Sequence, residues 1–257
     1  MAHIISVVNQ KGGVGKTTTT LNLAAYLAEA GKFVLLIDLD PQANATSGLG
    51  IDHRAISAGV YEGLIGSHAI RSLIHSTAHD GLRLLPATEA LAGASVELVT
   101  AQEREHFLHK ALLAVRNDYD YILIDNPPSL GMLTINGLVA ADSVLIPVQA
   151  EFYALEGLTQ LMNTVNLVRE NLKPNLDVLG AVITMYDSRT KLSKEVLEEL
   201  YRYFPDKIFR SVIPRSIRLA EAPSFGKTIL GYDPASKAAR SYERLAHEFI
   251  LRAEGAL

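Results

Sequence analysis

The stretch QKGGVGKTT, residues 10–18, decides the fold of this chain. A short apolar run, residues 3–8, precedes it, and residues 17–30 after it repeat leucine and alanine at helical spacing. Glycines let a backbone turn tightly and bring successive N–H groups close to phosphate oxygens. The amino terminus of the following helix adds its partial positive charge. The stretch therefore predicts a phosphate-binding loop between a strand and a helix.

Two side chains of this loop carry the predicted chemistry. Lys16 is expected to reach the β and γ phosphates of a nucleotide, and the Thr17 hydroxyl is expected to coordinate Mg²⁺. A bare glycine pattern often arises by chance, but Gly-Lys-Thr between a strand and a helix does not, so a simple helix-start turn is the weaker interpretation. The loop residues expected to bind the nucleotide are Gly12, Gly13, Val14, Gly15, Lys16, Thr17 and Thr18.

Aspartates end two further strand-like runs. Asp38 and Asp40 follow the apolar residues 33–37, and Asp125 ends the apolar run that begins at Tyr121. Carboxylates at the ends of buried strands that face a phosphate site suit Mg²⁺ coordination and the orientation of an attacking water. Turns at strand ends are the alternative interpretation of both groups. Beside a phosphate loop, these aspartates predict a magnesium-dependent site.

Strand-like and helix-like stretches alternate along the whole chain. Continuous apolar runs are typical of parallel strands covered on both faces. Their alternation with helices predicts an α/β fold of the P-loop NTPase class, a single doubly wound domain over residues 1–257 with a mostly parallel sheet flanked by helices. Further strands are expected at residues 82–85, 121–124, 143–148, 178–184 and 208–213, and further helices at residues 103–116, 157–171, 193–203 and 235–252.

The composition of the 257 residues excludes several classes of protein. Hydrophobic residues make up 48% and charged residues 20%, an ordinary balance for a globular protein with a core. Cysteine is absent, which excludes disulfide frameworks, thiolate metal sites and cysteine nucleophiles and makes a reducing cytoplasm the expected location. No apolar run reaches the roughly 18 residues that span a bilayer. Because the net charge is -4, contact with nucleic acid requires a local basic patch.

The loop departs from the usual P-loop pattern at two neighbouring positions. Gln10 stands where the pattern has glycine, and Lys11 is an additional lysine. This form resembles the deviant Walker A motif of the ParA/MinD family, and the aspartate groups follow in that family's order and approximate spacing. Resemblance to its Soj/ParA chromosome-segregation branch extends over nearly the whole chain, in residues 47–50 (SGLG), 91–99 (LAGASVELV), 128–136 (PSLGMLTIN), 149–158 (QAEFYALEGL), 184–189 (TMYDSR) and 213–227 (IPRSIRLAEAPSFGK).

The resemblance implies a role for each matching residue. Lys16 is the P-loop lysine, Lys11 is the lysine that reaches the partner's phosphates in an ATP-sandwiched dimer, and Asp40 positions the hydrolytic water. These three are the implied catalytic residues. The residues implied at the metal and its surroundings are Thr17, Asp38 and Asp125.

The resemblance also implies where the base binds. Adenine is expected near Met185 and near the turn that contains Pro214 and Arg215. The guanine-reading Asn-Lys-x-Asp pattern is absent, which favours ATP over GTP as the cofactor, together with Mg²⁺. Asn126, directly after the strand-end aspartate, departs from the family, in which a small or apolar residue is common there.

Members of this branch bind DNA non-specifically as ATP dimers and release it when a ParB-like protein stimulates hydrolysis, and the resemblance implies the same here. Arg189 and Arg218, in or beside loops of the more basic C-terminal region, are the implied DNA contacts. An ion pair with Asp187 or Glu221 is the alternative for each arginine. A cytoplasmic, nucleoid-associated homodimer without an N-terminal helix-turn-helix extension is expected.

Two other classes remain as alternatives. A MinD-like positioning ATPase usually ends in a basic amphipathic helix that inserts into a membrane. In residues 246–257 the apolar positions continue the face of the preceding helix, which favours core packing, so no membrane partner is expected. A biosynthetic ligase or metallocluster-assembly NTPase is the third class. The absence of cysteine excludes the cluster carriers, and no acid/base constellation of a ligase stands out.

Overall fold

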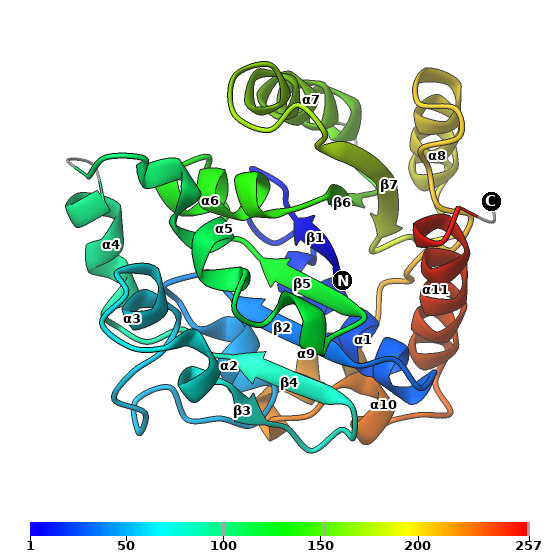
Figure 1. Cartoon of the computed structure of the whole chain (residues 1–257). Coiled ribbons are helices and arrows are strands. Elements are labelled where there is room, and N and C mark those ends of the chain that lie inside the picture. Colours follow the sequence, from blue (N-terminus) through cyan, green and yellow to red (C-terminus); the bar gives the residue numbers. More distant parts are fainter. Residues whose placement is uncertain (99–100, 152, 256–257) are drawn as a thin grey trace.

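The computed structural model describes residues 1–98, 101–151 and 153–255. Val99, Phe152 and the last two residues, which the sequence motifs above include, lie outside these ranges. Within the described residues, seven strands form a sheet in the order β3-β4-β2-β5-β1-β6-β7, and all neighbours are parallel except β3 and β4 (Figure 1). The strands are β1 (His3–Val7), β2 (Val34–Asp38), β3 (His75–Ser76), β4 (Leu82–Leu85), β5 (Tyr121–Asp125), β6 (Ser143–Gln149) and β7 (Asp177–Thr184).

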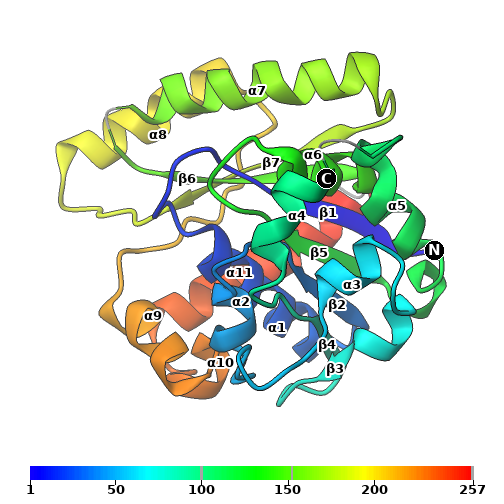
Figure 2. The ribbon, with the colours of Figure 1, turned by 90° about the vertical axis from the view of Figure 1, so that its left-hand side faces the viewer.

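Helices cover both faces of the sheet, as expected for a doubly wound α/β fold. The helices α1 (Lys16–Glu29) and α11 (Lys237–Ala253) pack on one face. The helices α5 (Phe107–Leu112), α6 (Met132–Ala140) and α7 (Ala154–Asn171) pack on the other, and Figure 2 shows α7 above the sheet. The structure also contains α2 (Asn44–Gly48), α3 (Val60–Leu64), α4 (Leu91–Glu97), α8 (Lys191–Tyr203), α9 (Ile217–Glu221), α10 (Ile229–Tyr232) and the 3-10 turns η1 (Ile70–Leu73), η3 (Arg104–His106), η4 (Arg116–Asp118) and η5 (Ala222–Phe225).

The alternation of side chains along each strand explains why both faces are apolar. In β2, Leu36 belongs to the core beneath α1 and α11, whereas Leu35 and Ile37 belong to the core beneath α5, α6 and α7. A strand covered on both sides therefore has a continuous apolar sequence.

Among the residues that the structure describes, we find no helix with the length and apolar character of a membrane-spanning segment.

The prediction of one continuous helix over residues 103–116 is wrong. The stretch divides into η3, α5 and η4, and the Asn136 side chain inserts into its backbone ladder between η3 and α5. The Leu108 N–H donates to Asn136 Oδ1 at 3.1 Å, and the Arg104 carbonyl accepts from Asn136 Nδ2 at 2.8 Å. A continuous α-helix would join that N–H to that carbonyl, so the inserted amide separates η3 from α5.

The prediction of a strand over residues 208–213 is also wrong, although the segment does run beside β7. Only isolated bridges form, at Ala181 with Ile208 and at Tyr186 with Pro214. Between them the N–H groups of residues 210 and 211 donate to the two carboxylate oxygens of Glu248 on α11, at 2.7 and 2.8 Å. The N–H groups of Phe209 and Ile213 donate to the carbonyls of Ala181 and Ile183 in β7, at 2.9 and 2.8 Å, so Glu248 interrupts the ladder by taking the Ser211 N–H that lies between them.

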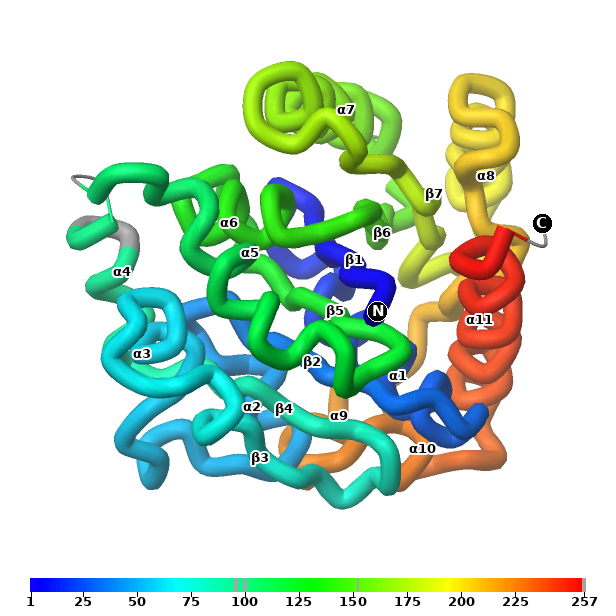
Figure 3. The backbone as a smooth tube through the Cα atoms, in the orientation of Figure 1, coloured from blue at the N-terminus to red at the C-terminus, as the bar shows by residue number. Residues whose placement is uncertain are grey.

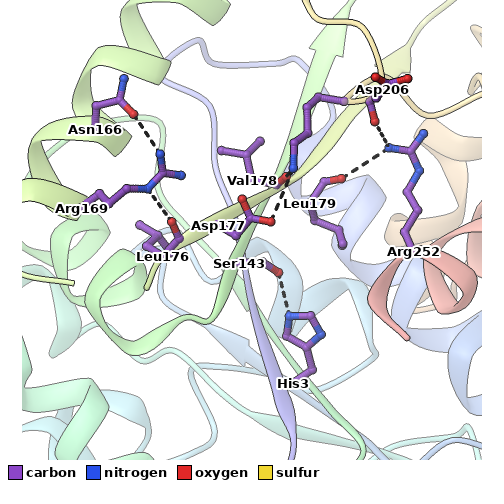
Figure 4. Close-up of polar contacts among 11 residues, drawn as sticks. His3, Ser143, Asn166, Arg169, Leu176, Asp177, Val178, Leu179, Asp206 and Arg252 are labelled. Carbon is purple, nitrogen blue, oxygen red and sulfur yellow. Dashed lines mark hydrogen bonds and ion pairs between the residues drawn. The ribbon is translucent and has the colours of Figure 1, made fainter. Parts of the chain in front are cut away.

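Cationic side chains bind the backbone at the amino-terminal end of β7. Figure 4 shows Arg252 donating to the Leu179 and Asp206 carbonyls, at 3.5 and 3.0 Å. Gly180, with a φ of 150°, lets the neighbouring segment approach closely, since a Cβ there would lie 2.7 Å from the Lys207 carbonyl oxygen. In Figure 3 the chain can be followed from α8 through this segment to α9 and α10.

The strand order places a binding crevice at the carboxyl ends of the central strands. β1 lies between β5 and β6, and the chain moves to one side of it with β2 and β4 and to the other side with β6 and β7. In open α/β sheets such a reversal leaves a crevice outside the carboxyl ends of the strands. The predicted loop follows β1, and the predicted aspartates end or follow β2 and β5.

Candidate nucleotide site

The loop between β1 and α1 has the backbone geometry of an anion site. Gly13 and Gly15 have φ angles of 75° and 87°, a left-handed backbone that favours glycine. The Thr19 N–H donates to the Gly15 carbonyl at 2.8 Å, so helical bonding begins directly after the loop. The first amides of α1 lack helical acceptors, and together with the helix dipole they favour a bound phosphate.

Lys16 provides a buried positive charge at this helix start. Its residue is 6% exposed, and its Nζ donates to the Lys11 carbonyl at 3.2 Å. Burial lowers the pKa of the Lys16 ammonium, while Asp125 and Asp40 oppose the shift. An ammonium that is buried beside a neutral carbonyl is well placed to take an anionic phosphate oxygen as a stronger partner.

Asp38 holds the segment that follows β2. Its Oδ2 accepts hydrogen bonds from the Thr46 N–H and from the Thr46 hydroxyl, both at 2.7 Å, and its Oδ1 accepts from the Asp40 N–H at 3.2 Å. Burial raises the pKa of Asp38 to about 6. Both oxygens thus already have partners, and Asp38 fixes α2 beside the loop.

One carboxylate oxygen of Asp125 has no hydrogen-bond partner among the described residues. Its Oδ1 accepts from the Thr20 hydroxyl at 3.0 Å, whereas its Oδ2 is buried without a hydrogen-bond partner among the described residues. Burial first, and then the charge of Asp38, raise the pKa of Asp125 to about 7, while the nearby hydroxyls of Thr17 and Thr20 oppose the shift. A buried, unpaired carboxylate oxygen beside a phosphate loop fits the hydrated shell of Mg²⁺.

The protein alone does not supply a complete metal site. Among the residues that the structure describes, no cluster of three or more His, Asp or Glu side chains is placed to hold a metal ion. Mg²⁺ commonly binds through one or two carboxylates or hydroxyls together with phosphate oxygens and waters. The donor set therefore fits a metal that arrives with a nucleotide.

Two adjoining cavities lie over the loop. The larger, of about 550 Å³, and the smaller, of about 200 Å³, share Gly15, Thr18 and Met185 in their linings. A nucleotide could therefore place its phosphates in the larger cavity and its base in the smaller cavity, and pass over these shared residues between them. The predicted site residues that line one or both cavities are Gly12, Gly13, Gly15, Lys16, Thr17, Thr18, Asp40, Met185, Pro214 and Arg215.

Three other predicted residues, Val14, Asp38 and Asp125, lie behind the cavity walls. Val14 is buried, and its carbonyl accepts a hydrogen bond from the Thr184 hydroxyl at 2.7 Å. Asp38 and Asp125 are fully buried at the strand ends. Any contact between these carboxylates and a bound cation therefore runs through water or through the threonines beside them.

The additional lysine is held within its own chain. Lys11 Nζ forms an ion pair with the carboxylate of Glu151, in the loop between β6 and α7, and the Lys11 side chain is 52% exposed. The Lys11 N–H donates to Asn9 Oδ1 at 3.0 Å. An exposed ion pair contributes only about 0–1 kcal/mol, so Lys11 can change partners at little cost.

Several residues that line the site belong neither to the phosphate loop nor to the strand-end aspartates, and they are not among the site residues predicted from the sequence. Thr184 ends β7, and its side chain would lie 3.7 Å from a Cβ at Gly15. Pro223 and Ser224 of η5, together with Asn44 and Ser47 of α2, line the larger cavity. Pro223, Ser224, Ser47 and Thr184 fall within the family-like stretches quoted above, which is the signal that could have found them.

Asn126 belongs to the core rather than to the cavity linings. Its Nδ2 donates to Ser6 Oγ at 2.9 Å and to the Val7 carbonyl at 3.0 Å, which ties β5 to β1. Gly137 of α6 packs against its other side, where a Cβ would lie 2.1 Å from Asn126 Oδ1. Asn126 therefore joins two strands and a helix beneath the site.

The two arginines predicted to contact DNA lie on the surface and outside both cavity linings. Arg189 Nη2 and Nε meet the two oxygens of Asp187 at 2.7 and 2.9 Å. Arg218 lies 3.2 Å from Glu221 and 3.5 Å from Asp233. The arginine side chains are 88% and 58% exposed. Since exposed ion pairs are weak, phosphate groups can compete for both arginines.

Comparison with known proteins identifies the family. The model of a family described as an AAA domain matches residues 2–178. The sporulation initiation inhibitor protein Soj of Bacillus subtilis is 54% identical over 248 residues, which cover 96% of this chain and 98% of that protein. The chromosome-partitioning ATPase Soj of Thermus thermophilus is 53% identical over 253 residues, which cover 98% of this chain and 97% of that protein.

A solved structure supports the fold. Cobyrinic acid a,c-diamide synthase from Mycobacterium smegmatis, with bound ADP and magnesium, superposes with a TM-score of 0.89 at 37% identity, covering 100% of this chain and 97% of that one. The Soj relatives are more similar in sequence than this synthase and match over nearly their whole length. With its lysine-rich phosphate loop and strand-end aspartates, this chain belongs to the Soj/ParA family of chromosome-partitioning ATPases.

Proposed function

We propose that this ATPase is a DNA-partitioning switch, which binds DNA without sequence preference as an ATP-bound homodimer and releases it after ATP hydrolysis. The observation that carries the proposal is the gathering of Lys16, Asp40 and the unpaired oxygen of Asp125 at one phosphate loop, in a chain 54% identical to Soj. We further propose that the whole chain acts as a single ATPase domain.

ATP and Mg²⁺ are the proposed cofactors. The amides of residues 12–18 and the Lys16 ammonium bind the phosphates, and the Thr17 hydroxyl and the Asp125 carboxylate hold the shell of the metal. Bound Mg²⁺ supplies positive charge that offsets the charge of the phosphate oxygens. Met185, Pro214 and Arg215 bind the base, which their place in the smaller cavity supports.

Asp40 is the proposed group that orients the attacking water. It lines the larger cavity together with Lys16, and it is 7% exposed. Its Oδ1 accepts a hydrogen bond from the Gln42 N–H at 3.0 Å, which fixes the direction of the carboxylate. A carboxylate held in this way can accept a hydrogen bond from water and set its line of approach to a phosphate.

The proposed partners are a second copy of the chain, double-stranded DNA and a ParB-like protein. In the proposed dimer Lys11 leaves Glu151 and meets the partner's phosphates. A ParB-like centromere-binding protein then stimulates hydrolysis and thereby releases DNA. These partners place the protein at the nucleoid.

DNA affinity is proposed to follow from valence. Each copy presents only a few exposed cations, of which Arg189 and Arg218 are the proposed contacts. Dimerisation doubles their number on one assembly, and each phosphate that is neutralised releases counterions. Binding that depends on the dimer therefore depends on ATP.

A MinD-like membrane role is the alternative, and the C-terminal helix argues against it. Leu245 and Phe249 of α11 are fully buried in the core. The apolar face of this helix is therefore already packed and not available to enter a bilayer.

DNA binding under defined nucleotides tests the proposal. The affinity of the protein for two unrelated duplexes is measured by fluorescence anisotropy with ADP, with ATP and with a non-hydrolysable ATP analogue. We expect similar affinities for both duplexes with the analogue and weak binding with ADP. Arg218→Glu is expected to weaken binding to both duplexes. It is also expected to flatten the slope of log K against log salt by about 0.9 for each phosphate that the variant no longer neutralises.

A matched control separates this effect from a general change of charge. Arg71→Glu alters another exposed arginine, which pairs with Asp118 at 2.6 Å, and is expected to leave DNA binding nearly unchanged. If Arg218→Glu binds DNA as tightly as the unmodified protein at matched salt, or if binding ignores the nucleotide, the proposed switch is wrong.

A further inference from the structure

One wall of the two cavities is built from residues 216–232, which run through α9, η5 and α10. We call this segment the C-terminal wall. Ser216 and Leu219 line the smaller cavity, and Pro223 and Ser224 line the larger one. Arg218 lies on the same segment, and Figures 1 and 2 both show α10 near α1. The position of the C-terminal wall therefore affects the nucleotide cavities and the proposed DNA contact together.

Contacts at the C-terminal wall make it one unit. Arg218 pairs with Glu221 at 3.2 Å and with Asp233, directly after the wall, at 3.5 Å. The Tyr232 hydroxyl donates to Glu221 Oε2 at 3.1 Å, and the rings of Phe225 and Tyr232 stack with their centroids 5.2 Å apart. These contacts join its two ends, so the segment is expected to shift as a body.

Asn22 connects the C-terminal wall to the helix that starts at the phosphate loop. Its Oδ1 accepts from the Ile229 N–H at 2.7 Å, and its Nδ2 donates to the Thr18 carbonyl at 2.7 Å. Thr18 lines both cavities, and Ile229 is the first residue of α10. Among the described residues, no other hydrogen bond from a side chain of α1 reaches the C-terminal wall.

The bond to Ile229 is costly to lose. Asn22 is 4% exposed and Ile229 is fully buried, so water does not readily replace the amide oxygen. The first N–H of a helix has no acceptor within its own helix. Leaving a buried donor without a partner changes an equilibrium constant by about tenfold or more. Asparagine also favours caps and turns over helix interiors, so its place on α1 is explained by this bond rather than by helix propensity.

The C-terminal wall also touches the segment that follows Asp40. Gly226 packs against Gly50, just beyond α2, and a Cβ on Gly226 would lie 2.6 Å from Gly50 Cα. Asp38 holds α2 through Thr46. The wall is thus held between the phosphate-loop helix on one side and the segment governed by the strand-end aspartates on the other.

We propose that Asn22 is a positioning residue that joins nucleotide binding to DNA binding. By holding the C-terminal wall against α1, it keeps Pro223 and Ser224 on the nucleotide cavity and makes the position of Arg218 depend on what occupies that cavity. This inference rests on the proposed function, because it assigns the coupling between the two sites that such a switch needs. By linkage, the bound nucleotide changes the affinity for DNA by the same factor by which DNA changes the affinity for the nucleotide. A loss of coupling therefore reduces both factors equally.

The test uses the full chain and one variant that removes only the bond to the wall. In Asn22→Ser the hydroxyl can still donate to the Thr18 carbonyl, as the Thr20 hydroxyl donates to the Lys16 carbonyl at 3.0 Å, but it is too short to reach Ile229. Asn22→Leu keeps a similar volume and removes both bonds. The measured quantity is the coupling ratio, which is the dissociation constant for a duplex with ADP divided by that with a non-hydrolysable ATP analogue.

The matched control is Asn136→Ser. Asn136 is also a buried asparagine that bridges a helix to backbone groups, but its partners Arg104 and Leu108 line neither cavity. Thermal unfolding of each variant is measured alongside binding. A purely structural role predicts that Asn22→Ser and Asn136→Ser lower the midpoint and have the same effect on the coupling ratio.

We expect both Asn22 variants to lower the coupling ratio about tenfold, and Asn136→Ser to leave it unchanged. An unchanged ratio in Asn22→Ser, while Arg218→Glu has lost DNA binding, overturns this inference and leaves the proposed function standing. An equal loss in Asn136→Ser overturns it as well, because general loosening then explains the effect. If Arg218→Glu retains full DNA binding, the proposed function itself is what fails.

Discussion

Asp38 and Asp125 lie side by side at the carboxyl ends of β2 and β5, paired in the parallel register and both fully buried. Thr46 binds one oxygen of Asp38 twice, whereas Oδ2 of Asp125 has no hydrogen-bond partner within the described chain. Burial raises the pKa of Asp38 to about 6 and, with the charge of Asp38, raises that of Asp125 to about 7. Near neutral pH the metal-free fold therefore holds an unfavourable pair of carboxylates that a divalent cation relieves.

Asp125→Asn is expected to stabilise the metal-free protein at pH 8 and to stabilise it less at pH 5. The folded pKa, about 7, lies above the ordinary aspartate value of 3.8, so between these two values the folded state binds more protons than the unfolded state, and the stability of the unmodified protein falls as the pH rises from 3.8 to 7. We expect a gain in unfolding free energy of about 2 kcal/mol at pH 8, measured by urea unfolding with a chelator present.

The exposed Asp80 offers the control, since Asp80→Asn removes a carboxylate from the surface. It is expected to change stability by less than about 0.5 kcal/mol at either pH. A gain in Asp125→Asn that is equal at both pH values, or larger at pH 5, contradicts the assignment of a raised pKa.

Lys16→Ala is expected to weaken ATP binding at least about 100-fold, because it removes a buried charge that faces the phosphates. The fold is expected to persist. Isothermal titration calorimetry measures the affinity, and Lys32→Ala, which changes a lysine paired with Glu254 far along the chain, is the control with normal affinity. Near-normal ATP affinity in Lys16→Ala would show that the loop does not bind phosphates as proposed.

Lys11→Ala is expected to bind ATP as a monomer but not to form the ATP dimer, since its proposed target lies in the partner subunit. Glu151→Gln removes the ion pair that Lys11 makes within its own chain. Because exposed pairs contribute about 0–1 kcal/mol, this variant is expected to strengthen ATP-dependent dimerisation by no more than about fivefold. Light scattering with a non-hydrolysable analogue measures both, and normal dimerisation of Lys11→Ala would refute its role.

Asp40→Ala is expected to bind ATP and to dimerise but to hydrolyse ATP about 100- to 10,000-fold more slowly, because the water loses the carboxylate that orients it. Phosphate release over time gives the rate, and light scattering detects a long-lived dimer. Asp52→Ala, in the exposed segment after α2, serves as the control with normal turnover. Normal turnover in Asp40→Ala would move the role to Asp125.

The sequence predicted the elements of the site that depend on local order. The phosphate loop needs only glycines between a strand and a helix, and Asp38 and Asp125 need only to end buried strands. Helices α1, α7, α8 and α11 lie within a few residues of their predicted ranges because their apolar spacing is regular. These features were therefore predictable without knowing which segments meet in space.

Two predicted elements failed because a distant side chain took their backbone partners. Asn136 enters the ladder near Leu108, and Glu248 binds the N–H groups at residues 210 and 211. Neither Asn136 nor Glu248 is near in sequence to the segment whose backbone it binds. Local propensity describes a segment by itself and therefore cannot include a competing partner from another element.

The sequence by itself determined the fold class, the phosphate loop and the identities of the acidic and basic groups, since each depends on residue type and short spacing. Only the tertiary structure decided which of these groups contact one another. Both oxygens of Asp38 accept hydrogen bonds, whereas one oxygen of Asp125 has no hydrogen-bond partner among the described residues. Lys11 pairs with Glu151, and Asn22 holds the C-terminal wall. Hydrogen bonds between distant segments form only where packing brings donor and acceptor within about 3 Å, and packing is a property of the whole chain.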